Sequence, residues 1–274
     1  MAVTMADIQK LRKMTGAGMM DCKNALTEAN NDFDQAMKII REKGQAVAAK
    51  RSDRDASEGC VLVKTVEGFG AMIALKCETD FVAQNADFVK LTQDILDAAL
   101  AAKCKTLDEV KALPMAGATV EQAVIDRSGI TGEKMELDGY LTLEGASIST
   151  YNHQNKNFLC TMVALNKAVD AKVGHEVAMQ IAAMAPIAVD EAGIPLDVLE
   201  REKEIAMEKA RQEGKPENML EKIAMGRIGK FYKEACLLKQ EYIQDAKLTV
   251  ADYLKSFDKE LTVVDFKRFT LRAE

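Results

Sequence analysis

The stretch that decides the fold runs from Gly59 to Cys77 and reads GCVLVKTVEGFGAMIALKC. Two apolar runs, 60–66 and 71–77, flank the turn-forming pair Glu67-Gly68, which is the pattern of a β-hairpin. Before this hairpin the apolar residues recur at helical spacing, and a helical pattern also follows it. The change of period predicts a helical N-terminal segment followed by a mixed core.

The same order of elements recurs later in the chain. Residues 137–150 and 158–165 have strand-like patterns, and a helical pattern follows them. Matching residues 73–75 with 163–165 puts the two following helices nearly in register. We therefore expect two related strand-strand-helix halves, which form an α+β core with antiparallel sheets.

The first 43 residues predict three short helices, the first of which has Ile8, Leu11 and Met14 as apolar residues at the helical spacing of a buried face. Thr4, Asp21 and Asp32 stand where N-caps are expected, and Gly44 follows the third helical pattern. Residues 50–58 read KRSDRDASE and contain no large apolar side chain. This composition predicts a linker between a small helical domain and the core.

A second helical segment interrupts the later half of the core. Between Pro195 and Ala235 the chain is highly charged and has no strand pattern. Helical patterns up to residue 213 and from residue 217, joined by Gly214-Lys215-Pro216, predict an antiparallel helical hairpin with thin apolar stripes. We expect it to project. The expected domains are the N-terminal helical domain with its linker (1–55), the first core subdomain (56–140), and the second (141–274) with the hairpin inserted at about 190–235.

Composition restricts the class of protein. Of the 274 residues, 48% are apolar and 29% are charged, which is ordinary for a globular protein. A net charge of −6 disfavours direct binding of nucleic acid, which needs a basic face. No apolar run approaches the roughly 18–20 residues that cross a bilayer, and the start lacks a signal-peptide pattern. We expect a cytoplasmic protein that does not contact a membrane.

The residues that usually carry chemistry are scarce. The six cysteines include no CxxC pair, there are two histidines, and GRIGK at 226–230 lacks the spacing of a phosphate loop. Glu78, Asp80 and Asp87 could form a carboxylate cluster, but no nucleophile or positioned base accompanies them. We therefore expect no catalytic residue, no metal site and no cofactor. The pattern favours a protein that acts on another protein.

The segment Thr79-Asp80-Phe81-Val82 lies between the second strand and its helix, and it has two interpretations. Phe81 and Val82 could be a hydrophobic staple under the helix start, with Thr79 or Asp80 as its cap. Alternatively, they could contact a partner. The corresponding loop of the second half, 166–171, has no aromatic residue. A shared scaffold therefore does not need Phe81, which favours a function specific to the first loop.

Two further segments have open interpretations. Met19 and Met20 follow a glycine-containing turn, where they could fill the small core or form an adaptable contact patch with Arg12 at its rim. His153 lies in a polar turn between strands, where a lone histidine is usually only a surface residue.

Three segments together resemble the bacterial elongation factor Ts family, the guanine-nucleotide exchange factors of elongation factor Tu. They are LRKMTGAGMMDCK at 11–23, TDFV at 79–82, and the hairpin around 214–227. The resemblance extends over nearly the whole chain. It implies a ubiquitin-associated-like N-terminal domain, a two-part core and a protruding coiled coil. The best-known members continue with a further C-terminal helical module, which we expect to be absent after Glu274.

The resemblance also implies a function in the elongation step of protein synthesis. The chain would bind GDP-loaded and nucleotide-free elongation factor Tu and promote exchange of GDP for GTP. Thr79, Asp80, Phe81 and Val82 would disturb the Mg²⁺ site of the partner. Arg12, Met19 and Met20 would grip a helix of its nucleotide domain, and His153 would touch the same domain. The main alternative is an adaptor that binds partners without changing nucleotide exchange, and an enzyme is a more distant one.

Overall fold

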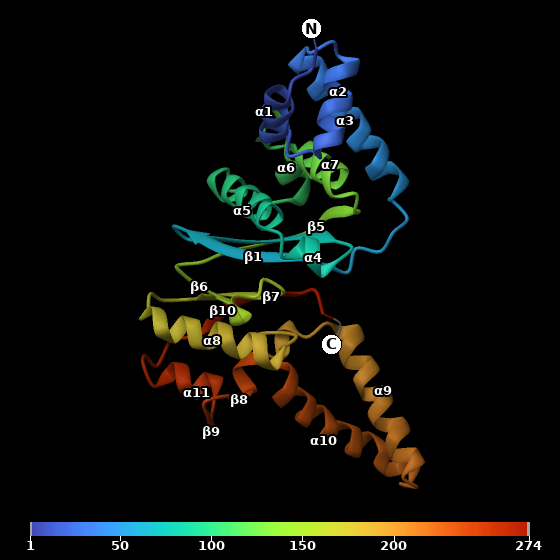
Figure 1. The fold of residues 1–274 in the computed structure, drawn as a ribbon. Helices are drawn as coiled ribbons and strands as arrows, with labels where there is room; N and C mark the ends of the chain where they lie inside the picture. Colours follow the sequence, from blue (N-terminus) through green and yellow to red (C-terminus); the bar gives the residue numbers. More distant parts are fainter. Residues whose placement is uncertain (1, 273–274) are drawn as a thin grey trace. The chain divides into compact units, whose positions relative to one another are not determined.

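Helices and small sheets alternate along the chain, which gives the expected α+β fold (Figure 1). The computed structural model describes residues 2–272. Their contacts divide the chain into two compact units. The first unit consists mainly of residues 2–62 and 72–141, and the second consists of residues 63–71 and 142–270.

Three helices open the first unit: α1 (Met5–Thr15), α2 (Met19–Glu28) and α3 (Phe33–Lys50). Thr4 starts α1 with a reciprocal cap. Its hydroxyl accepts the Asp7 N–H at 3.2 Å, and the Asp7 carboxylate accepts the Thr4 N–H at 3.0 Å. Gly16 ends this helix with a φ of 73°. The three helices enclose a small core, which consists of Ile8, Leu11, Ala17, Cys22, Ala25, Leu26, Ala29 and Ala36.

Three expectations for this segment are wrong. The N-cap of α2 is Gly18, and Asp21 lies in the first turn, where it forms an ion pair with Lys43 of α3. The third helix does not end before Gly44 but continues through it for another six residues, so the linker starts after Lys50. Met14, expected on the buried face of α1, is 52% exposed.

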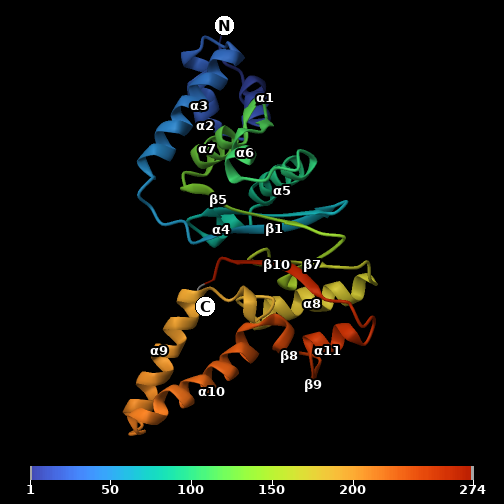
Figure 2. The same ribbon diagram turned by 180° about the vertical axis from the view of Figure 1, so that it is seen from behind.

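Gly44 continues the helix because it lies at a close contact between two helices. It faces Gly129 of α7 (Val120–Thr131), and a methyl group on Gly129 would lie 2.2 Å from the Gly44 Cα. Figure 2 shows α3 and α7 side by side. Beside this contact, Arg41 of α3 forms an ion pair of 3.2 Å with Asp126 of α7. The two helix backbones are therefore packed directly on each other.

The first sheet contains β1 (Glu58–Val66), β2 (Phe69–Cys77) and β5 (Met135–Glu144), in the order β1-β2-β5. The two-residue connection Glu67-Gly68 between β1 and β2 confirms the predicted hairpin. Between β2 and β5 the chain forms α4 (Asp80–Ala83), α5 (Ala86–Ala101), α6 (Leu107–Ala112), the short strands β3 (Pro114–Met115) and β4 (Ala118–Thr119), and α7. The fully buried side chains of β2 and α5 include Ile73, Leu75, Phe88, Ile95 and Leu96.

The second sheet contains β6 (Ser147–Asn152), β7 (Leu159–Leu165) and β10 (Val263–Thr270), all antiparallel, in the order β10-β7-β6. The 3₁₀ helix η1 (His153–Asn155) lies in the connection from β6 to β7, and α8 (Ala171–Met184) packs on both strands. Later come η3 (Leu237–Lys239), β8 (Glu241–Tyr242), β9 (Asp245–Thr249) and α11 (Val250–Lys255). The core of this unit includes Val163, Leu165, Val177, Ile181, Leu237, Tyr253, Leu254 and Leu261.

The two sheets have the same arrangement of strands. In each, the second strand of the half, β2 or β7, is central, its sequence neighbour pairs on one side, and a strand from later in the chain pairs on the other. A helix, α5 or α8, follows the central strand in both cases. This arrangement agrees with the predicted repeat of two strands and a helix. The assignment of all of residues 137–150 to the second half is wrong, however, because β5 (residues 135–144) pairs with β2 in the first sheet and only β6 belongs to the second.

The charged segment of the second unit forms two helices, α9 (Leu196–Gln212) and α10 (Glu217–Ala235), which follow the 3₁₀ helix η2 (Glu191–Gly193). Gly214 turns the chain with a φ of 72°. The helices pack through small and aliphatic side chains, and an ion pair of 3.6 Å joins Lys203 of α9 to Glu221 of α10. The predicted antiparallel helical hairpin is therefore present.

Candidate functional site

The segment Thr79–Val82 forms a single helical turn and not the loop that the sequence predicts. The turn, α4, follows β2 after residues 78 and 79, and the Thr79 side chain caps it by accepting the Val82 N–H at 3.4 Å. Asp80 is exposed and Val82 is partly buried. Phe81 is 84% exposed, the largest exposed fraction among the exposed large apolar side chains of residues 2–272.

This exposure decides between the two interpretations of Phe81. A hydrophobic staple requires a buried side chain, so that interpretation is wrong for Phe81, although Thr79 does act as a cap. The following helix has its own cap, because the Asn85 side chain accepts the N–H groups of Asp87 and Phe88 at 2.9 and 3.3 Å. Phe88 supplies the fully buried aromatic ring under that helix. The fold therefore does not use Phe81 for packing.

Polar contacts hold the start of the α4 turn. Glu133 accepts two hydrogen bonds from Thr79, one from the backbone N–H at 3.1 Å and one from the hydroxyl at 2.6 Å. The neighbouring Glu78 accepts the Lys134 N–H at 2.6 Å and two bonds of 3.1 Å from the Arg51 guanidinium. The Lys134 N–H outweighs the opposing effect of burial and, with Arg51, lowers the pKa of Glu78. Sequence reasoning missed Glu133, Lys134 and Arg51 because their partners are distant in the sequence.

The equivalent connection of the second half is fixed differently. Asn166 donates from its backbone N–H to the Thr262 carbonyl at 3.2 Å and from its amide to the Glu260 carbonyl at 2.8 Å. Val169 packs against the core of the second unit. Residues 166–170 contain no exposed aromatic side chain. Exposed Phe81 is thus a feature of the first half alone.

The end of α1 and the start of α2 carry a second candidate surface. Met19 and Met20 are 38% and 63% exposed, and neither belongs to the buried core of the three helices. The interpretation of these methionines as core residues is therefore wrong. Arg12 is also exposed. Exposed Met14, which the periodicity had assigned to the core, adds a third thioether in the same segment.

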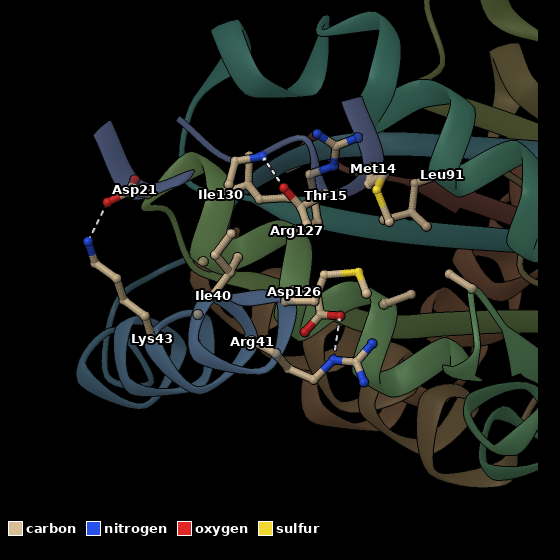
Figure 3. A pocket seen from close by; sticks show the side chains of 16 residues that line it. Met14, Thr15, Asp21, Ile40, Arg41, Lys43, Leu91, Asp126, Arg127 and Ile130 are labelled. Atoms are coloured by element: carbon tan, nitrogen blue, oxygen red, sulfur yellow. Dashed lines mark hydrogen bonds and ion pairs between the residues drawn. The ribbon is translucent and has the colours of Figure 1, made fainter. Parts of the chain in front are cut away.

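Beside this segment is a cavity of about 320 Å³ that α1 and α3 share with α7 (Figure 3). It combines apolar side chains with the ion pairs of Arg41 with Asp126 and of Lys43 with Asp21. Its apolar lining includes Met14, Met37, Ile40, Leu91, Ala123 and Ile130. The cavity borders the contact between α3 and α7.

His153 belongs to the second unit and is more constrained than a surface histidine. It is partly buried, its Nδ1 lies 3.1 Å from the Tyr151 hydroxyl, and its ring packs in a T-shaped arrangement with that of Phe158 at a centroid distance of 5.8 Å. The turn after it is held by Asn152, whose amide donates to the Asn157 side chain at 2.7 Å. The ring of His153 is therefore oriented by Tyr151 and Phe158, and this arrangement is compatible with the surface position expected for it.

The structure brings Thr79, Asp80, Phe81 and Val82 into one turn and places Arg12, Met19 and Met20 in one segment, both within the first unit. The carboxylates considered as a cluster have separate partners, because Glu78 contacts Arg51 and Asp87 lies 3.6 Å from Arg127. Burial raises the pKa of Cys60 and of Cys77 to about 12, so both remain protonated thiols. Over residues 2–272, none of the helices is both long and apolar enough to span a bilayer.

Comparison with known proteins identifies the family. The family model described as elongation factor Ts matches residues 78–273, which include the α4 turn. The elongation factor Ts of Bacteroides fragilis (strain YCH46) is 61% identical, and that of Bacteroides thetaiotaomicron is 58% identical. That of Porphyromonas gingivalis (strain ATCC 33277) is 56% identical, and all three comparisons cover 100% of both chains. Proteins of this family are nucleotide-exchange factors and are not enzymes. The chain therefore belongs to the elongation factor Ts family and acts in translation elongation.

Proposed function

We propose that the chain binds elongation factor Tu and accelerates the release of GDP and its replacement by GTP. The observation that carries this proposal is the 84% exposure of Phe81 on a turn whose first residues are fixed by hydrogen bonds. A large apolar ring held in solvent without a packing role is a candidate for insertion into a partner. Burying such a side chain is worth about 1.5–3 kcal/mol.

The exchange function follows from differential binding. A nucleotide held at nanomolar affinity is bound by about 12 kcal/mol, much of it through Mg²⁺ and phosphate contacts. An exchange factor weakens this binding only if it binds the nucleotide-free partner better than the loaded one, and the coupling is reciprocal. Phe81 would open a cleft behind the metal site and displace the Mg²⁺ ligands without touching the nucleotide.

The other residues of the turn have supporting roles in this proposal. Asp80 is exposed beside Phe81 and would compete for polar groups near the metal site of the partner. Thr79 caps the turn, and partly buried Val82 would widen the apolar contact at its base. The ring of Phe81 supplies most of the apolar area, so we assign it the larger effect.

Arg12, Met19 and Met20 would hold a helix of the partner's nucleotide domain. Two exposed thioethers form a soft apolar surface that adapts to a helix, and the guanidinium supplies a directed polar contact at its edge. We propose that residues 1–55, with the three helices, are a ubiquitin-associated-like domain that contributes this contact separately from the α4 turn.

The second core subdomain (141–274) would contribute two further contacts. The restrained ring of His153 would touch the nucleotide domain, and the tip of the α9–α10 coiled coil would protrude to another region of the partner. The first core subdomain (56–140) would carry the α4 turn. The proposal places the chain in the cytoplasm, where translation elongation takes place.

Stopped-flow fluorescence with GDP-loaded elongation factor Tu tests the proposal. Adding the chain should accelerate release of a fluorescent GDP analogue, and Phe81→Ala should slow the stimulated release about tenfold or more, because up to about 3 kcal/mol of buried apolar contact is lost. An adaptor that leaves exchange unchanged predicts no acceleration by the unmodified chain. Equal release rates for Phe81→Ala and the unmodified chain would contradict the wedge mechanism.

A further inference from the structure

We propose that Glu133 and Arg51 are positioning residues that hold the α4 turn so that Phe81 points away from the fold. This inference deepens the proposed function and rests on it. Neither residue needs to touch the partner. They act on Glu78 and Thr79, the two residues that precede Asp80.

Glu133 fixes the first residue of the turn through both of its carboxylate oxygens. One oxygen accepts the Thr79 N–H and the other accepts its hydroxyl hydrogen, at 3.1 and 2.6 Å. Because the hydroxyl donates to Glu133, its lone pair is free to accept the Val82 N–H. Hydrogen bonds to a charged acceptor are about twice as strong as neutral ones. Glu133 therefore sets the rotamer of the cap and, through it, the direction of the turn.

Arg51 fixes the residue before the cap. Its guanidinium lies 3.1 Å from both oxygens of Glu78, whose side chain is only 16% exposed. Glu78 also accepts the Lys134 N–H. Two consecutive residues, 78 and 79, are thus held by two consecutive residues, 133 and 134, with Arg51 as a third anchor.

Both anchors stand at the ends of the packed helix pair. Arg51 is the C-cap residue of α3, and Glu133 follows Gly132, the C-cap of α7 with a φ of 72°. The Gly44–Gly129 contact and the Arg41–Asp126 ion pair hold the two helices together. The pair therefore acts as a rigid support for the turn.

A rigid support matters because a wedge must resist displacement. A ring on a mobile turn would fold back before it opened a cleft, and the ordering cost would be subtracted from the binding free energy. If the competent orientation is populated less, the apparent strength of the interaction falls in proportion. Loss of the anchors should therefore weaken the action of Phe81 without removing Phe81.

The chain offers a direct probe of the turn because it has no tryptophan. Phe81→Trp introduces a single tryptophan at the exposed position, and time-resolved anisotropy with excitation selective for tryptophan reports its mobility without any partner. In this background Glu133→Ala should increase the amplitude of fast depolarisation. Glu133→Gln, which keeps one acceptor oxygen, should give a smaller increase. Glu136→Ala is the matched control, because that glutamate forms an ion pair of 3.3 Å with the Lys134 side chain and not with residue 78 or 79, and it should leave the decay unchanged.

Release kinetics test the consequence of the anchors. Glu133→Ala should slow stimulated GDP release about threefold to tenfold in the otherwise unmodified chain and have no further effect in the Phe81→Ala background. Arg51→Ala should have a smaller effect, because Glu78 retains the Lys134 N–H. Circular dichroism melting shows whether the variants remain folded.

The possible failures are distinguishable. An anisotropy decay that Glu133→Ala leaves unchanged overturns the positioning role, whatever the partner does. The double variant gives a second test of the positioning role. If the slowing of GDP release by Glu133→Ala multiplies with the slowing by Phe81→Ala, the two residues act independently, and the positioning role is overturned. If the unmodified chain does not accelerate GDP release, the proposed function fails, and the anisotropy alone then shows whether Glu133 holds the turn.

Discussion

Replacing Gly129 by alanine tests the contact between α3 and α7 with a single methyl group. The alanine Cβ would lie 2.2 Å from the Gly44 Cα and 3.1 Å from its carbonyl carbon. Backbone atoms cannot yield as a flexible side chain does, so α3 has to move away by about 1 Å or more. Overpacking of this kind costs about 1–3 kcal/mol. Higher helix propensity returns up to about 1 kcal/mol of that cost. We therefore expect a net loss of stability.

Gly44→Ala is the matched control for this prediction. Its Cβ would lie 3.5 Å from the Gly129 Cα, which is an ordinary van der Waals contact. The gain in helix propensity then dominates, so this variant should be neutral or up to about 1 kcal/mol more stable. Thermal unfolding followed by circular dichroism should give a lower Tm for Gly129→Ala and an equal or higher Tm for Gly44→Ala, with about 2–4 °C of shift per kcal/mol. Equal Tm values for the two variants would refute the direct backbone contact.

Two further predictions concern other parts of the chain. Burial opposes ionisation of Glu176, but hydroxyl donors from Tyr253 and Tyr242 hold its pKa below the usual value. The stability from this group is therefore present above about pH 4.3, the pKa in the unfolded chain, and is lost as the pH falls through the lower folded pKa. In urea unfolding, Glu176→Gln should flatten the pH dependence of the free energy of unfolding below about pH 4.5. An unchanged pH dependence would show that Glu176 is not its source. Separately, Met20→Ala should weaken binding to elongation factor Tu about tenfold by calorimetry. Met5→Ala, which removes another exposed methionine of the same helices, should not, and equal losses would contradict a specific contact.

Local patterns predicted much of the fold. The hairpin around Glu67-Gly68, the caps at Thr4 and Asp32, and the turn at Gly214 depend on neighbouring residues, so the sequence reveals them directly. The comparison of the two halves also predicted that the scaffold does not need Phe81, and its exposure agrees.

Features that depend on distant partners could not be read in this way. Gly44 resembles a helix end until α7 is known to lie against it, and Met14 has the spacing of a core residue although it borders a cavity. Glu133 is 54 residues away from Thr79, so no local pattern connects them. The site residues were thus predictable as a motif, whereas the contacts that orient them were not.

The most direct test of the proposed mechanism is the affinity of the chain for two forms of elongation factor Tu. Calorimetric titration should give binding to the nucleotide-free form that is about tenfold or more tighter than binding to the GDP-loaded form with Mg²⁺. Phe81→Ala should reduce this ratio, because the wedge acts only where the metal site can open. Equal affinities for the two forms would contradict the mechanism, since a factor without a preference cannot displace the nucleotide.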